Sequence, residues 1–168
     1  MIILGIDPGS RFTGFAVIEV IGRKLNYLDS GILNFSKEKD FLKRIPLIFE
    51  ESLALIEKYK PTEIAIESLI FVKNVNSLAK LSQARGAILS GLTVDNQIPI
   101  AEYSPNLIKS SVSGYGHSSK EQISKSLKLI FGKEKINFIK DDESDALAIA
   151  VTHFLLRNSR SLNKRIAS

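Results

Sequence analysis

The chain of 168 residues has no cysteine, only two histidines and no long apolar run. Without cysteine it can form no disulfide, no thiolate metal site and no thiol nucleophile. The longest unbroken apolar run, residues 146–151, is far too short to cross a bilayer. The N-terminus also lacks a basic segment before its apolar stretch, so we expect no secretory signal peptide. We therefore expect a cytoplasmic protein without a membrane span.

The composition is that of an ordinary globular protein, with 44% hydrophobic and 24% charged residues and hence no disordered or membrane bias. A chain of 168 residues can bury a substantial core and is of typical length for one domain. We find no linker, repeat or low-complexity segment. The expected organisation is a single domain over residues 1–168, with a short basic tail from about residue 157.

Basic residues are concentrated in three segments of the chain. Residues 104–140 contain seven lysines against two glutamates, while residues 68–94 and 157–168 contain basic residues and no acid. Such segments, in a protein of net charge +5 that also clusters its acids, fit a polyanion held by its phosphates. For any one segment alone, a solvated helix face explains the charge equally well.

The acids fall at the ends of apolar elements. Asp7 follows the apolar stretch that begins the chain, and Glu67 ends a second short apolar stretch. A third acidic cluster, residues 141–145, opens an apolar helix. Carboxylates that crowd together repel one another, and their pKa values rise unless a divalent cation neutralises them. The pattern therefore indicates one metal site built from acids that are far apart in the chain.

Each of these acids has a plainer interpretation when taken alone. The sequence Asp-Pro-Gly-Ser at residues 7–10 favours a turn role for Asp7. Glu67 could be the polar end of a strand, and the acids at 141–145 could cap a helix and interact with its dipole. The two histidines, His117 and His153, are expected to be a loop residue and a helix residue rather than ligands. Only as a set do the acids favour a site.

Hydrophobic periodicity and turn residues predict five strands and five helices. The expected strands are 2–7, 14–20, 25–35, 62–67 and 98–103, and the expected helices are about 39–60, 75–95, 105–112, 119–131 and 142–157. Pro46 either kinks the first helix or marks its start. This order predicts an α/β fold with a mixed five-stranded sheet flanked by helices. If strands 2–7 and 62–67 are parallel neighbours, Asp7 and Glu67 lie side by side at one sheet edge.

The spacing of the third acidic cluster leaves one position open. Asp142 and Asp145 are three residues apart and would share one helix face, so they could complete the set. Asp141 also lies one helical turn from Asp145 and is almost as suitable. Spacing does not decide between Asp141 and Asp142.

Four short motifs occur in order over essentially the whole chain. They are residues 5–11 (Gly-Ile-Asp-Pro-Gly-Ser-Arg) with Thr13 and Gly14, residues 65–67 (Ala-Ile-Glu), residues 83–86 (Gln-Ala-Arg-Gly) and residues 142–150 (Asp-Glu-Ser-Asp-Ala-Leu-Ala-Ile-Ala). In this order and spacing the chain resembles the crossover-junction endonucleases of the RuvC type, which resolve Holliday junctions. The resemblance implies a ribonuclease H-like fold and catalytic acids at Asp7, Glu67, Asp142 and Asp145. It thereby favours Asp142 over Asp141.

The resemblance implies a structure-specific endonuclease that makes paired nicks in opposing DNA strands during recombination and repair. It further implies two Mg²⁺ ions per active site, or Mn²⁺ in their place, bound by the four acids. Asp7 is expected to bridge the ions, with Glu67 on one ion and Asp142 and Asp145 on or near the other. The implied partners are four-way junction DNA, a second copy of the chain in a homodimer, and the branch-migration motor of RuvA and RuvB.

Five residues are candidates for DNA contacts: Phe71, Lys73, Arg85, Lys109 and Lys120. Lys109 and Lys120 match basic positions that the resembled family uses near the phosphate backbone. Phe71 falls in the loop where family members carry an aromatic residue that wedges against junction bases, although a place in the core explains it equally well. Lys73 and Arg85 belong to the acid-free segment 68–94.

Other classes of protein share parts of this pattern. A non-catalytic nucleic-acid-binding module, or a ribonuclease H-like nuclease of other specificity, would keep the basic surface. The Asp-Pro-Gly-Ser turn also occurs in actin-like sugar kinases, but these need two such lobes and 168 residues do not supply a second. The complete set of four acids argues against a module without catalysis.

Overall fold

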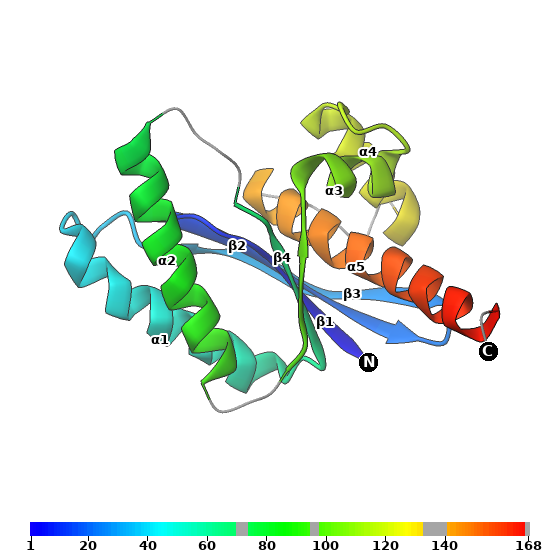
Figure 1. Ribbon diagram of the computed structural model, residues 1–168, viewed down its shortest axis with the longest axis horizontal. Coiled ribbons are helices and arrows are strands. Elements are labelled where there is room, and N and C mark those ends of the chain that lie inside the picture. Colours follow the sequence, from blue (N-terminus) through cyan, green and yellow to red (C-terminus); the bar gives the residue numbers. More distant parts are fainter. Residues whose placement is uncertain (70–73, 95–97, 133–140, 167–168) are drawn as a thin grey trace.

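The structure is a computed structural model that describes residues 1–69, 74–94, 98–132 and 141–166 (Figure 1). In the last of these ranges, side chains are described for residues 143–157. Phe71 and Lys73 therefore lie outside the described residues, and of Asp141 and Asp142 the structure describes the backbone alone. Within the described parts, no helix is long and apolar enough to cross a membrane.

A mixed sheet of five strands forms the centre of the molecule, as the sequence predicts. The strands are β1 (Ile2–Asp7), β2 (Phe12–Ile21), β3 (Lys24–Asn34), β4 (Glu63–Glu67) and β5 (Ile100–Tyr103), arranged in the order β3-β2-β1-β4-β5. The first three strands pair antiparallel, whereas β4 lies parallel to both β1 and β5. The carboxyl ends of β1, β4 and β5 therefore meet at one edge of the sheet.

Helices cover both faces of the sheet (Figure 1). They are α1 (Phe41–Tyr59), α2 (Val75–Thr93), α3 (Pro105–Ser113), α4 (Lys120–Phe131) and α5 (Asp141–Ile166). The pair α1 and α2 packs on one face, and α5 lies on the other face with α3 and α4 beside it. This confirms the predicted α/β architecture.

Helix α1 decides between the two roles considered for Pro46, and helix α5 is clearly longer than predicted. Helix α1 begins after Asp40, whose side chain accepts a hydrogen bond from the N–H of Leu42, so Pro46 lies inside the helix and does not start it. Helix α5 continues to Ile166 instead of ending near residue 157. No glycine or proline follows residue 157 to stop it, so the segment expected to be a basic tail has a helical backbone.

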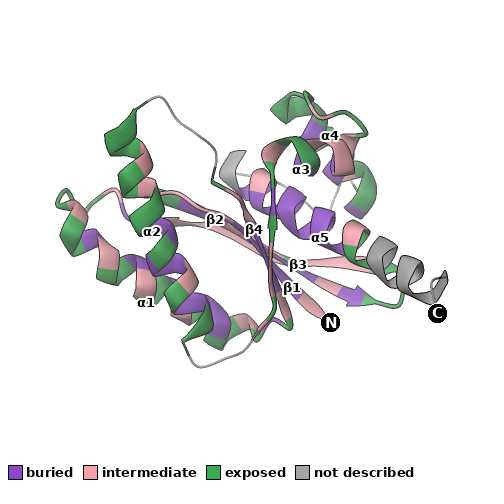
Figure 2. Ribbon diagram, in the orientation of Figure 1, coloured by how far each residue is buried: buried purple, intermediate pink, exposed green. Residues whose placement is uncertain are grey.

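Alternate residues of the central strands face two separate cores. Leu4, Ile6 and Ile66 belong to the core beneath α1 and α2, whereas Ile3 and Ala65 belong to the core beneath α5. Figure 2 shows that the buried residues follow the sheet and the inner sides of these helices. Because side chains alternate along a strand, the acids at the ends of β1 and β4 face α5.

Helix α5 approaches β1 very closely at Gly5. A Cβ atom at Gly5 would lie 2.3 Å from the carbonyl oxygen of Ala146 and 2.9 Å from Cβ of Ala150. Only glycine in the strand and small residues in the helix allow this contact. It places the N-terminal turn of α5, which contains Asp142 and Asp145, near the carboxyl end of β1.

Candidate active site

Asp7 and Glu67 end two neighbouring parallel strands. The register of β1 and β4 pairs Ile6 with Ile66, so the next residue of each strand is one of the two acids. Both acids are half-buried, and both face α5. The condition under which Asp7 and Glu67 would lie side by side, that the strands expected at 2–7 and 62–67 are parallel neighbours, is therefore met.

The turn after Asp7 is held by specific hydrogen bonds. The buried Thr13 hydroxyl donates to the carbonyl of Gly9 (3.0 Å) and accepts from the Gly9 N–H (3.3 Å). A Cβ at Gly9 would lie 1.9 Å from the carbonyl oxygen of Phe12, so the turn requires glycine there. Arg44 of α1, which is buried, donates to the carbonyl of Ser10 (2.9 Å). These contacts hold the carboxyl end of β1 in place.

A cavity of about 210 Å³ lies between β4, α3, α4 and α5. Its polar lining consists of Glu67, Lys109, Lys120 and Asp145. The apolar part of the lining comes from Pro105, Ile108, Ile123, Ala148 and Ile149. Two of the predicted acids and two of the predicted basic residues thus share one cavity, although they come from four different elements.

The cavity disfavours the ionised form of Glu67. Burial raises the pKa of Glu67, the negative charge of Asp145 raises it further, and Lys109 and Lys120 lower it by less. Lys120 Nζ lies 3.0 Å from Asp145 Oδ2, so the lysine is already engaged with the other acid. The two lysines therefore do not fully offset the cost of an ionised Glu67.

The donor set suits a hard divalent cation. Carboxylate oxygens are the ligands that Mg²⁺ and Mn²⁺ prefer, and a cation would offset both the burial of the Glu67 carboxylate and its repulsion by Asp145. Among the side chains that the structure describes, no three of Asp, Glu and His lie close enough to hold a metal ion by themselves. Asp142, the fourth predicted acid, has only its backbone described, in the first turn of α5 three residues before Asp145.

The structure brings together two of the five residues predicted to contact DNA, Lys109 and Lys120. Arg85 lies elsewhere, buried on α2, with its Nη2 3.0 Å from Oε1 of Glu102 on β5. Its charge is directed at Glu102 rather than at solvent, so a contact of Arg85 with DNA stays a prediction. Phe71 and Lys73 lie outside the described residues.

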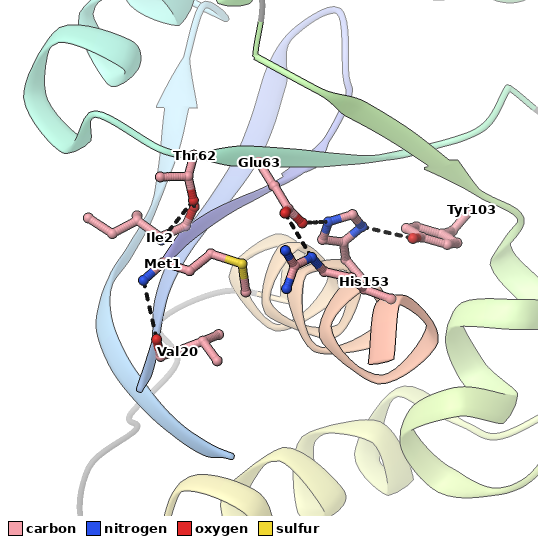
Figure 3. A network of polar contacts seen from close by, with 8 residues as sticks. Met1, Ile2, Val20, Thr62, Glu63, Tyr103 and His153 are labelled. Atoms are coloured by element: carbon pink, nitrogen blue, oxygen red, sulfur yellow. Dashed lines mark hydrogen bonds and ion pairs between the residues drawn. The ribbon is translucent and has the colours of Figure 1, made fainter. Parts of the chain in front are cut away.

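The predicted places of the two histidines are confirmed. His117 is an exposed residue of the loop between α3 and α4, where its ring packs against Tyr115. His153 is buried on α5, where its Nε2 lies 2.7 Å from Oε2 of Glu63 and its Nδ1 lies 2.8 Å from the Tyr103 hydroxyl (Figure 3). Arg157 Nε is 2.7 Å from the other Glu63 oxygen.

This polar network around His153 was not expected from the sequence. Glu63 begins β4 and Glu67 ends it, so the network binds α5 at one end of β4 while the cavity lies at the other. In the sequence, the network is indicated only by Glu63, a charged residue at the start of the apolar strand β4. That signal did not reveal its partners, because they are 90 and 94 residues away in the chain.

Comparison with known proteins agrees with this geometry. The family model described as "Crossover junction endodeoxyribonuclease RuvC" matches residues 3–153. The RuvC protein of Petrotoga mobilis is 46% identical over 159 residues, which cover 95% of this chain and 96% of the relative. That of Thermosipho melanesiensis is 41% identical over 150 residues, covering 89% and 94% of the two chains.

A solved structure described as "T. thermophilus RuvC in complex with Holliday junction substrate" has the same fold. It superposes with a TM-score of 0.82 at 29% identity and covers 94% of each chain. This confirms the predicted ribonuclease H-like fold. The family match spans Asp7, Glu67 and the acidic turn of α5, the segments that the sheet and helix bring to one edge. The chain therefore belongs to the RuvC family of crossover junction endodeoxyribonucleases.

Proposed function

We propose that this chain resolves Holliday junctions by paired nicks in two opposing strands, at an active site formed by Asp7, Glu67, Asp142 and Asp145. The observation that supports this most strongly is that Asp7 and Glu67 each follow the last paired residues of β1 and β4, at one sheet edge near the acidic first turn of α5. The solved T. thermophilus relative holds a Holliday junction substrate, which supports the same substrate for this chain.

Membership of the RuvC family implies a hydrolase that depends on a divalent metal. In our proposal the four acids hold two Mg²⁺ ions, or Mn²⁺ in their place. Asp7 would be shared by the two ions, Glu67 would bind one, and Asp142 and Asp145 would bind or orient the other. When bound, the ions would activate the attacking water and stabilise the leaving 3′-oxygen. The raised pKa of Glu67 supports this assignment, since it reflects the burial of this carboxylate and the nearby charge of Asp145, both of which a bound cation would offset.

Lys109 and Lys120 would hold the DNA backbone beside these acids. Each lines the cavity, and the Lys120 side chain is 54% exposed, so a phosphate can reach it. The ion pair of Lys120 with Asp145 neutralises part of the acidic site while no substrate is bound. An incoming phosphate competes for Lys120, and a cation competes for Asp145. Binding of substrate and metal would therefore give each member of the pair a new partner of opposite charge.

Paired nicks in opposing strands require two active sites on one junction. We therefore propose that the chain acts as a homodimer, as a single domain over residues 1–168, in the cytoplasm. The branch-migration motor of RuvA and RuvB is the proposed partner. One sheet covered by helices on both faces supports the single domain.

The test is a cleavage assay with purified protein and a synthetic four-way junction, with and without Mg²⁺. The expected result is nicks at symmetric positions in two opposing strands, only when metal is present, and little cutting of a linear duplex of the same sequence. Binding without cutting would instead indicate a non-catalytic module. Equal cutting of the linear duplex would indicate a ribonuclease H-like nuclease of other specificity.

A further inference from the structure

Strand β3 contains a bulge that changes which side chains face α5. The pairing of β3 with β2 passes over Leu28. Tyr27 and Ser30 are three residues apart, so in a regular strand they would face opposite sides of the sheet. The extra residue turns both to the same face, and the Tyr27 hydroxyl lies 2.9 Å from Ser30 Oγ. Asp29 faces the other side, where it pairs with Lys58 of α1.

Ser30, which pairs with Tyr27, contacts Glu143 in the first turn of α5. Ser30 Oγ donates a long hydrogen bond of 3.4 Å to Oε2 of Glu143. Glu143 is only 8% exposed, although it lies in a cluster of acids that would be solvated at most helix starts. A buried carboxylate needs hydrogen-bond partners, and β3 supplies one of them.

Glu143 and Asp145 point to different sides of α5. Residues two apart on a helix do not share a face. Asp145 lines the cavity with Glu67 on the β4 side, whereas Glu143 contacts Ser30 on the β3 side. Glu143 is therefore separated from the cavity, but it belongs to the same helical turn as the acids that we assign to the metal site.

The position of this turn matters for metal binding. The rest of α5 is held at Gly5 by close packing and at Glu63 by the His153 network. Metal ligands depend on neighbouring residues that hold them in place, and loss of such a neighbour typically costs about 10–100-fold in metal affinity or activity. At the first turn, the contact of Glu143 with Ser30 provides such support.

We propose that Glu143 is a positioning residue: by accepting the Ser30 hydrogen bond it holds the first turn of α5, and with it Asp145, where the active site requires it. Glu143 itself is neither a metal ligand nor a catalytic residue in this scheme. The inference rests on the proposed function, because it gives Glu143 a role toward acids that are proposed to bind the metal.

The experiment compares Glu143→Ala, Glu143→Gln, Ser30→Ala and the Ser30→Ala/Glu143→Ala double variant with the wild type. Glu50→Ala, at an exposed position on α1, is the matched control. Mn²⁺ binding is measured without DNA by electron paramagnetic resonance, and cleavage of a four-way junction is measured under single-turnover conditions. Melting temperatures without metal show whether each variant folds.

Both single alanine variants should weaken Mn²⁺ binding and slow cleavage at subsaturating metal by about tenfold. The double variant should lose no more than Glu143→Ala alone, because Ser30→Ala removes a contact that Glu143→Ala has already removed. Glu143→Gln keeps an acceptor oxygen and should stay within about threefold of the wild type, a rescue that a metal ligand would not show. Junction affinity without metal should be unchanged in every variant.

Three results would overturn the proposal. Wild-type Mn²⁺ binding in Ser30→Ala would show that the hydrogen bond does not position the turn. A loss in Glu143→Gln as large as in Glu143→Ala would show that the charge matters and not the acceptor oxygen. Additive losses in the double variant would show that the two residues act independently. Failure of the proposed function would look different, since the wild type itself would then neither bind Mn²⁺ nor cut the junction.

Discussion

Lys120 Nζ lies 3.0 Å from Oδ2 of Asp145, so the first residue of α4 neutralises an acid of α5 at the edge of the cavity. Glu67, the other acid of the cavity, keeps a raised pKa in spite of this lysine and of Lys109. Burial is the main cause of this raised pKa and the charge of Asp145 adds to it, so the lysines only partly offset the cost of ionising Glu67. Substitutions, pH and metal should therefore affect the protein through the ionisation of these acids.

Replacing Asp7 by asparagine should abolish cleavage while leaving the fold and junction binding intact. The amide keeps the shape of the side chain but lacks the charge that Mg²⁺ requires. Single-turnover cleavage and gel-shift binding in Ca²⁺, measured on the same preparation, check both halves of the prediction. Substantial cleavage by the variant would remove Asp7 from the site.

Replacing Asp142 by asparagine should reduce cleavage far more than the same change at Asp141. Helix spacing alone did not separate the two acids, and the family motif favours Asp142. Asp141→Asn should cost no more than a weakened helix start, about 0.5–2 kcal/mol of stability. Cleavage rates and urea unfolding of the two variants form a matched comparison. The opposite order of rates would mean that the motif is shifted by one residue.

Lys109→Ala and Lys120→Ala should each weaken junction binding and reduce its dependence on salt. Each lost phosphate contact lowers the slope of log affinity against log salt by about one. The preferred cleavage sequence should not change, because backbone contacts do not read bases. Lys58→Ala, on the other side of the sheet, is the control. Slopes equal to that of the wild type would show that the DNA is held elsewhere.

Glu67→Gln should stabilise the metal-free protein at neutral pH and destabilise it relative to the wild type when metal is added. The pKa of Glu67 is higher in the folded than in the unfolded state, so folding favours the protonated carboxyl. The resulting stability is fully present at low pH and is lost as the pH rises through the raised pKa of the folded state. A glutamine never ionises and avoids this loss, but it is a poor metal ligand. The effect should be modest, since Glu67 is only half-buried.

Thermal melting at pH 4 and pH 7.5, with and without Mg²⁺, checks the prediction for Glu67. Without metal, the advantage of the glutamine variant should shrink as pH falls toward the range in which both side chains are neutral. With metal, the order of the two melting temperatures should reverse at pH 7.5. An advantage that is the same at both pH values would point to packing and not to charge.

Gly5→Ala should destabilise the protein by about 1–3 kcal/mol and lower its activity. The added Cβ would lie 2.3 Å from the backbone oxygen of Ala146, so α5 must move away from β1 and take its acids with it. Gly86→Ala is the control, because its Cβ meets no atom within 4 Å and alanine favours a helix by up to about 1 kcal/mol. Equal effects of the two substitutions on urea unfolding would contradict this close approach.

Much of the fold and of the candidate site could be predicted from the sequence. Strand β1 is predicted by an apolar run that turn residues follow directly in the chain. The acids at the ends of β1 and β4 likewise adjoin apolar runs. Local patterns of this kind depend on contiguous residues and can be read without a structure. The same holds for the five-stranded sheet and for the acidic start of α5, although the helix proved longer than predicted because nothing in its sequence stops it.

Other features were decided only by the tertiary structure. Lys120 meets Asp145 across 25 residues, Ser30 meets Glu143 across 113, and Arg85 is buried against Glu102 instead of lying on a basic surface. The bulge at Leu28 is equally invisible in the sequence, since it depends on how β3 pairs with β2. Residue type and spacing determined which side chains could bind a metal or a phosphate. The packing of α5 on β1 decided which of these side chains lie close together. Burial and charge pairing arise only when elements distant in the chain are in contact.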